Sequence, residues 1–147
     1  MAADPVFLDT NVLVAASVNA HPSHARAVAL ISRLLEEQVP LAISSQICRE
    51  FLVVLTRQPV EGRTFSTQEG VDVLDRWRST CTVFDDDLPV LTELIAIVRR
   101  YAVKGKQIHD ANVVATMRAN GVARLATFNA ADFHRFEDEV RLEPVTS

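Results

Sequence analysis

Short apolar runs along the chain alternate with longer segments whose apolar residues recur at helical spacing. The runs predict strands over residues 6–8, 41–43, 81–84 and 124–127, with a weak fifth over 140–142. The longer segments predict helices over 23–38, 45–55, 66–79, 87–98 and 107–120, after a short helix near 12–16. Strands that alternate with helices form a parallel sheet covered on both faces. The predicted fold class is therefore α/β, with one short parallel sheet of four to five strands.

Capping residues mark several of these helix boundaries. Ser23 is a candidate N-cap, and Asp87 begins another helix. Ser66 and Glu69 match a capping box. One helix carries an apolar stripe made of Ala27, Leu30, Ile31, Leu34 and Leu35. The helix that begins at Asp87 holds Leu91, Leu94, Ile95 and Val98.

Length and composition fit a single globular domain over residues 1–147. Hydrophobic residues make up 48% of the chain and charged residues 23%, which excludes a disordered or fibrous protein. No apolar run approaches the roughly 20 residues of a membrane span, so we expect a cytoplasmic protein without a membrane partner. A net charge of −4 excludes a protein that coats nucleic acid by overall charge. Cys48 and Cys81 form no metal-binding motif and are expected to be buried reduced thiols.

Two carboxylates occupy positions that point to chemistry. Asp9 follows the first strand directly, at the sheet edge where α/β proteins bind ligands, although it could serve only as a helix N-cap. Glu50 shares the apolar stripe of its helix with Ile47 and Val54. A buried carboxylate is costly unless it is paired or binds metal, so the alternative for Glu50 is an ion pair with an arginine.

Two further carboxylates follow the same pattern. Asp110 begins the apolar stripe that continues through Val113 and Val114, although an acid in the first turn could merely favour the helix dipole. Asp132 lies among phenylalanines after the fourth strand, where it could also be a helix cap. The four acids are 41, 60 and 22 residues apart (50 − 9, 110 − 50 and 132 − 110), so only a folded sheet could gather them.

Gathered acids require a cation. Two carboxylates about 5 Å apart repel by roughly 3 kcal/mol at an effective dielectric constant near 20. Hard oxygen ligands without a His or Cys cluster select Mg²⁺ or Mn²⁺ over zinc. The predicted site is therefore a divalent metal centre held by carboxylates.

Other polar residues carry weaker signals. Asn11, Ser44 and Thr127 follow strand ends and could orient carboxylates or water, or simply cap helices. His109 fits a turn or surface position at least as well as a catalytic one. Four cations upstream of Asp110 could hold RNA phosphates or form a solvated helix end: Arg99, Arg100, Lys104 and Lys106.

The four acids lie in segments 7–13, 49–51, 109–111 and 127–133, which together resemble the PIN domain. The resemblance is in particular to the toxin (VapC-like) ribonucleases of bacterial toxin–antitoxin pairs. It implies a Rossmann-like α/β/α sandwich and an endoribonuclease that cleaves RNA with water activated by Mg²⁺ or Mn²⁺. It also implies a cognate antitoxin and a toxin homodimer as partners.

Carried over position by position, the resemblance makes Asp9, Glu50 and Asp110 the metal-binding catalytic acids and Asp132 a fourth catalytic acid. Asn11, Thr127 and Asn129 would support them. Asn129 stands where some relatives carry a further acid, so Asp132 could bind metal directly or only position water.

Two other functions compete with this interpretation. A haloacid-dehalogenase-type phosphatase also places an Asp after its first strand, but it uses Asp-x-Asp, and here the third residue is Asn11. A PIN-like module could instead grip RNA or protein without cutting it. The presence of all four acids argues against that alternative.

Overall fold

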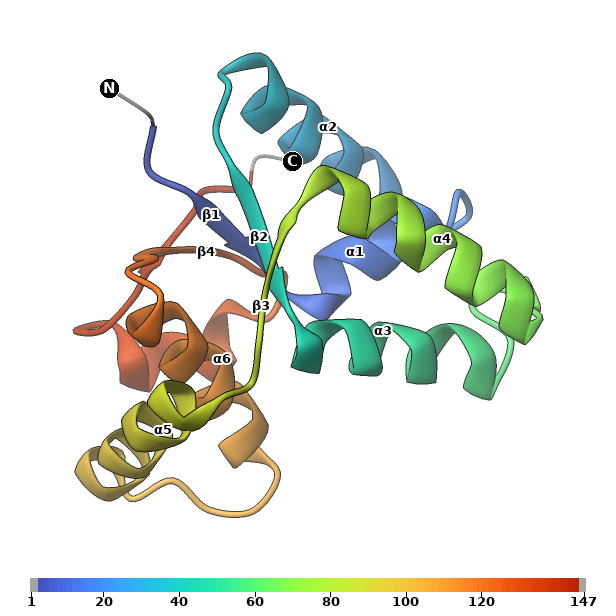
Figure 1. The fold of residues 1–147 in the computed structure, drawn as a ribbon. Coiled ribbons are helices and arrows are strands. Elements are labelled where there is room, and N and C mark those ends of the chain that lie inside the picture. Colours follow the sequence, from blue (N-terminus) through green and yellow to red (C-terminus); the bar gives the residue numbers. More distant parts are fainter. Residues whose placement is uncertain (1–2, 146–147) are drawn as a thin grey trace.

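The protein folds as a five-stranded parallel sheet flanked by helices (Figure 1), in a computed structural model that describes residues 3–145. The strands are β1 (Val6–Leu8), β2 (Leu41–Ser44), β3 (Thr82–Phe84), β4 (Arg124–Ala126) and β5 (Arg141–Leu142). The helices are α1 (Thr10–Ser17), α2 (His24–Glu36), α3 (Ser45–Arg57), α4 (Thr67–Thr80), α5 (Leu88–Tyr101), α6 (Gln107–Ala119) and the 3₁₀ helix η1 (Ala130–Phe136). The predicted α/β class and all five predicted strands are confirmed.

The strand order β3-β2-β1-β4-β5 places β1 at the centre of the sheet. Phe7 pairs with Ala42 of β2 on one side and with Leu125 of β4 on the other, and all three residues of β1 are fully buried. The chain adds β2 and β3 on one side of β1 and β4 and β5 on the other. The carboxyl end of β1 is therefore the point where the strand order reverses, which is where open α/β sheets bind ligands.

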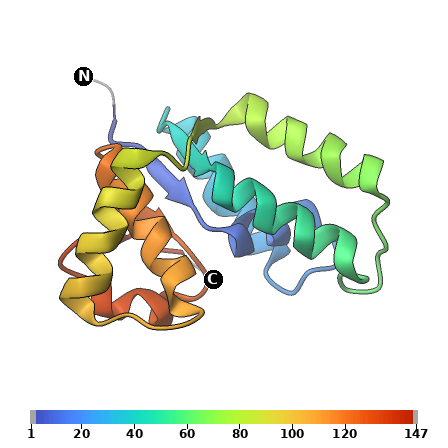
Figure 2. The ribbon, with the colours of Figure 1, turned by 60° about the horizontal axis from the view of Figure 1, so that its bottom comes forward.

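The helices form two groups on either side of the sheet (Figures 1 and 2). Helix α1 packs against both α2 and α3, α3 packs against α4, and α5 packs against α6. No helix among the described residues is long and apolar enough to cross a membrane.

Local capping signals explain where several helices begin. Ser66 and Glu69 make both hydrogen bonds of the predicted capping box, and the Asp87 side chain accepts from the amide of Val90. Ser23 precedes α2 as predicted, but its side chain makes no capping hydrogen bond. Instead the amide of Ser23 donates to Nδ1 of His21. The His21 side chain, and not a cap from Ser23, therefore holds the backbone of the loop before α2.

The apolar residues of α2 and α5 are not all buried. Leu35 lies on the exposed side of α2, and Leu91 and Ile95 of α5 are 48% and 49% exposed. The buried positions of α5 are Val90 and Ile97, with Leu94 and Val98 half-buried. The apolar residues of α5 span a wider arc than the face that packs against α6. Periodicity alone therefore could not identify the buried side. Cys81 is a buried free thiol as predicted, whereas Cys48 is only half-buried.

A buried carboxylate fastens the second helical group. The Glu139 side chain is 3% exposed and accepts hydrogen bonds from Tyr101, Arg100 and Arg118. Because these donors come from α5 and α6, one acid after η1 ties both helices to the C-terminal part of the chain.

We expect Glu139→Gln to lower the free energy of unfolding by about 2 kcal/mol, because a buried acceptor of charged hydrogen bonds loses its charge. Urea denaturation followed by circular dichroism measures the change. Glu93→Gln is the matched control, since Glu93 pairs with Arg118 at 3.3 Å on the surface and should contribute less than about 1 kcal/mol. Equal losses in the two variants would contradict a special role for Glu139.

Candidate active site

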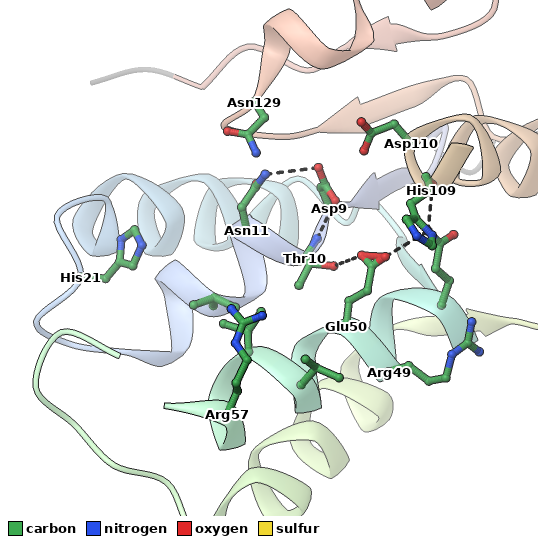
Figure 3. Close-up of a pocket in the computed structure, with 14 residues that line it drawn as sticks. Asp9, Thr10, Asn11, His21, Arg49, Glu50, Arg57, His109, Asp110 and Asn129 are labelled. Atoms are coloured by element: carbon green, nitrogen blue, oxygen red, sulfur yellow. Dashed lines mark hydrogen bonds between the residues drawn. The ribbon is translucent and has the colours of Figure 1, made fainter. Parts of the chain in front are cut away.

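A pocket of about 660 Å³ opens beside the carboxyl end of β1 (Figure 3). Its walls come from the β1–α1 junction, from α3, from the start of α6 and from the segment after β4. Three of the predicted acids line it together, namely Asp9, Glu50 and Asp110, and so do the predicted supporting residues Asn11 and Asn129. The fold therefore gathers carboxylates that lie up to 101 residues apart in the chain (110 − 9).

Asp9 is buried and held from three directions. Its Oδ1 accepts from the amide of Thr10 at 2.8 Å, which makes it the N-cap of α1. Its Oδ2 accepts from the Thr127 hydroxyl at 2.8 Å and from the Asn11 amide at 3.2 Å. Burial raises the pKa of Asp9, although the hydrogen bonds from Thr127 and Thr10 act in the opposite direction. Asp9 therefore caps α1 and lines the pocket at the same time.

A polar network fixes the orientation of Asp9. The Thr127 hydroxyl oxygen accepts from the side chain of Asn11 at 3.2 Å and from the amide of Asn129 at 3.0 Å. Asn11 in turn accepts from the amide of Phe128 at 3.0 Å. These contacts connect the start of α1 to the end of β4, so the carboxylate cannot rotate without breaking several hydrogen bonds. Ser44, by contrast, caps α3 by accepting from the amide of Ile47.

Glu50 faces Asp9 from the first turns of α3 and is half-buried. Its Oε1 accepts from the Thr10 hydroxyl at 2.9 Å, and its Oε2 accepts from the Gln46 amide at 3.1 Å. Among the described residues Glu50 forms no ion pair with an arginine, so the alternative of a structural ion pair is wrong. Thr10 bridges the two acids, because its amide donates to Asp9 and its hydroxyl to Glu50.

Gln46 is a residue that the sequence analysis missed. It is buried, and its Nε2 also donates to the backbone carbonyl of His109 at 2.8 Å, while its Oε1 accepts from Asn112 at 2.9 Å. It therefore joins α3 to the beginning of α6, next to Asp110. A polar residue one helical turn before Glu50 on the same stripe was the available signal.

Asp110 lies in the first turn of α6 and is half-buried. Burial, together with the negative charges of Asp132, Asp9 and Glu50, raises its pKa from 3.8 to about 6. Asp132 itself is exposed on η1 and does not line the pocket. The structure therefore places three acids within the pocket and the fourth outside its lining, close enough to act on Asp110 electrostatically.

The donor set suits a hard cation. All the candidate ligands are carboxylates, and their like charges add to the cost of ionising Asp110. Within residues 3–145 no three His, Cys, Asp or Glu side chains are already arranged as a metal cluster. The acids thus share a pocket without forming a closed ligand cage among the described residues.

The cations of the pocket differ from those that the sequence suggested. Arg99, Arg100, Lys104 and Lys106 do not line it, and Arg100 pairs with Glu139. The pocket is instead lined by Arg49, Arg57, His21 and His109. Arg49 and Arg57 share the helix of Glu50, at its exposed edge, where an arginine carries no distinctive sequence signal.

Comparisons with known proteins agree with this arrangement. A family model described as "PIN domain" matches residues 6–139. The chain is 24% identical over 141 residues to Ribonuclease VapC24 of Mycobacterium tuberculosis, covering 95% of this chain and 97% of the relative.

Two solved structures share the fold. One is VapC20 of M. tuberculosis, described as a sarcin–ricin loop-cleaving toxin, with a TM-score of 0.66, 17% identity, and coverage of 92% of this chain and 96% of the other. The other is a toxin–antitoxin complex from Klebsiella pneumoniae, with a TM-score of 0.62, 20% identity, and coverage of 97% and 98%.

The raised pKa of Asp110 predicts how the metal-free protein responds to pH. The folded state holds this proton more tightly than the unfolded chain, so the stabilising contribution of Asp110 is greatest below about pH 4 and is lost as the pH rises through about 6. We expect Asp110→Asn to unfold at a higher temperature than the wild type at pH 7.5 in EDTA. After allowance for solvent screening, the gain is about 1 kcal/mol.

Thermal unfolding at pH 4, 5, 6 and 7.5 measures this difference, which should vanish at the lowest pH. Asp138→Asn, at an exposed turn outside the pocket, is the control and should give no such gain. A variant less stable than the wild type at pH 7.5 would show that Asp110 supports the fold rather than straining it.

Proposed function

The chain belongs to the PIN domain family, and from this premise we propose that it is a divalent-metal-dependent endoribonuclease, the toxin of a toxin–antitoxin pair. The match over residues 6–139 confirms the resemblance found in the sequence. The observation that carries the proposal is the convergence of Asp9, Glu50 and Asp110 from three separate elements on one pocket. The name of the M. tuberculosis relative, a ribonuclease, supports the choice of RNA as substrate.

The carboxylates of this chain would hold Mg²⁺ or Mn²⁺, with Asp9 and Asp110 as ligands and Glu50 completing the site. When bound, such an ion polarises the scissile phosphate and lowers the pKa of an attacking water. Thr10 keeps Asp9 and Glu50 at a set separation through its two hydrogen bonds. Asp132 would act from the rim of the site.

The supporting residues have separate tasks in this proposal. Thr127 and Asn11 hold Oδ2 of Asp9, which leaves the carboxylate little freedom to turn away from the pocket. Asn129 lines the pocket beside Asn11, across from the residues of α3 (Figure 3), and offers a side-chain amide to a phosphate oxygen. Positioning of this kind lowers the barrier, because the reacting groups need not be reordered at the moment of reaction.

The competing functions fit less well. Family membership leaves the haloacid-dehalogenase interpretation without support, because that interpretation rested only on an Asp after the first strand. A non-catalytic PIN-like module would have no need to retain three carboxylates whose charges oppose one another in a pocket. The activity assay below separates cleavage from binding alone.

Partners follow from the same surfaces. An acid-lined pocket suits the forked guanidinium of an arginine from a cognate antitoxin, acting with the toxin in the cytoplasm. One of the structures that share the fold is a toxin–antitoxin complex. A homodimer would have an available apolar face on α5, where Leu88 is 75% exposed beside Leu91 and Ile95.

We expect Asp9→Asn to lower the rate of RNA cleavage by about a hundredfold or more, because a metal ligand that stabilises transition-state charge is lost. Cleavage of a labelled RNA by wild type and variant is compared in Mg²⁺, Mn²⁺ and EDTA. The wild type should cut in either metal and not in EDTA. Equal activity under all conditions would refute a metal-dependent ribonuclease.

Metal binding should also stabilise the fold. Saturating Mg²⁺ or Mn²⁺ at about 100 times its dissociation constant adds about 2.7 kcal/mol to the stability of the folded state. Each kcal/mol corresponds to about 2–4 °C in Tm for a domain of this size. Differential scanning fluorimetry with and without metal measures the rise, and Asp110→Asn should fold but lose it. A variant that keeps the full rise would remove Asp110 from the ligand set.

A further inference from the structure

The pocket extends well beyond the acids along one face of α3. Glu50, Val53, Val54 and Arg57 are related by steps of three, four and seven residues, so they share that face. Val14 of α1 and His21 of the α1–α2 loop also line the cavity, and His21 lies on the same side as Arg57, away from Asp110 (Figure 3). The far end of the pocket is therefore apolar in its wall and cationic at its rim (Figure 3).

The valine wall is accessible. Val53 is 52% exposed and Val54 is half-buried, while Val14 of α1 is only 6% exposed and lines the pocket behind them. Apolar side chains that remain open to solvent in a pocket favour a flat apolar ligand surface, such as the face of a nucleobase. The acids at the other end offer such a ligand nothing to stack on.

The rim has donors that are free to bind an anion. Arg57 is the last residue of α3, is exposed, and forms no ion pair with any described residue. Nδ1 of His21 accepts from the amide of Ser23 at 3.0 Å, so a neutral His21 carries its proton on Nε2. Both side chains can therefore donate hydrogen bonds to a phosphate oxygen.

Resting on the proposed function, we propose that Val14, Val53, Val54, Arg57 and His21 form a nucleotide subsite for the RNA next to the scissile phosphate. The base packs against the valines, and the neighbouring phosphate binds the guanidinium of Arg57 and Nε2 of His21. A two-turn helical span separates Glu50 from Arg57, about 10 Å along the axis, which leaves room for a nucleotide between the two ends.

Charge favours RNA as the occupant. The chain carries a net charge of −4, so a polyanion is held only where local cations offset the acids. The Arg49 guanidinium lies 4.0 Å from the carboxylate of Asp86 and pairs with it. Arg57 has no acidic partner among the described residues. A segment of an antitoxin is the rival occupant, and the experiment distinguishes it.

The test compares Arg57→Gln with Arg76→Gln, a matched change at an exposed arginine of α4 that does not line the pocket. The probe is a single-stranded RNA of mixed sequence with a fluorophore and a quencher, cut in Mg²⁺. We expect Arg57→Gln to raise KM about tenfold with kcat nearly unchanged, because a charge-assisted contact outside the reacting atoms is lost. Arg76→Gln should leave both constants unchanged.

A binding measurement makes the result independent of cleavage. Fluorescence anisotropy of the same RNA without its quencher, in the Asp9→Asn background, gives the affinity as a function of salt. Adding Arg57→Gln should weaken binding and reduce the salt slope by about one, as expected for one lost phosphate contact. Val53→Asp should also raise KM, and its matched control is Val28→Asp at an exposed valine of α2.

Three results would overturn the proposal. One is an unchanged KM and RNA affinity in Arg57→Gln. Another is loss of RNA affinity on Arg99→Gln but not on Arg57→Gln, which would place the RNA on the end of α5. The third is an unchanged KM in Val53→Asp, which would leave the apolar wall to a protein segment such as the antitoxin rather than to a nucleobase. Absence of cleavage by the wild type would defeat the proposed function, while the anisotropy comparison would still decide whether this subsite binds RNA.

Discussion

The burial of the Asp9 carboxyl at the end of the central strand is the constraint on which the site depends. Because β1 is covered on both faces and paired on both edges, the residue that follows it has little access to water. Hydrogen bonds from Thr10, Asn11 and Thr127 make this position tolerable without supplying a positive charge. Bringing Glu50 and Asp110 to the same pocket adds repulsion, so the fold tolerates an electrostatic cost at one place that a cation would relieve.

Neutral side chains, rather than charged ones, hold this arrangement together. Thr10 links the acids of β1 and α3, while Gln46 links α3 to the beginning of α6. A threonine and a glutamine can donate hydrogen bonds to carboxylates without neutralising them. An arginine in either place would form an ion pair with the acids and compete with a metal for them. The network therefore preserves the negative potential of the pocket while fixing its geometry.

Charge is divided along the pocket in a way that suits a polyanion on an acidic protein. The acids occupy the end next to β1, and Arg57 and His21 occupy the end along α3. Seven of the other twelve arginines form ion pairs with described acids, among them Arg100 and Arg118 with Glu139 and Arg124 with Glu143. The positions of the cations without an acidic partner that line the pocket, and not the net charge, decide where a phosphate chain can bind there.

The positions of the strands along the chain, the capping box at Ser66 and the α/β class followed from the sequence, because they rest on local periodicity and local hydrogen bonds, whereas the order of the strands in the sheet did not. The acids at positions 9, 50 and 110 could also be identified from the sequence. Asp9 follows a buried strand directly, and a carboxylate on an apolar helix stripe, as at positions 50 and 110, is costly unless it has a partner. Which side of α5 is buried was not visible, because Leu91 and Ile95 are as apolar as Val90 and Ile97. The roles of Gln46 and Arg57 could not be predicted either. The hydrogen-bond partners of Gln46, and the lack of an acidic partner for Arg57 among the described residues, depend on segments far away in the chain. Local free energies set the elements, whereas contacts between distant segments, which only the tertiary structure creates, decided what those elements present to one another.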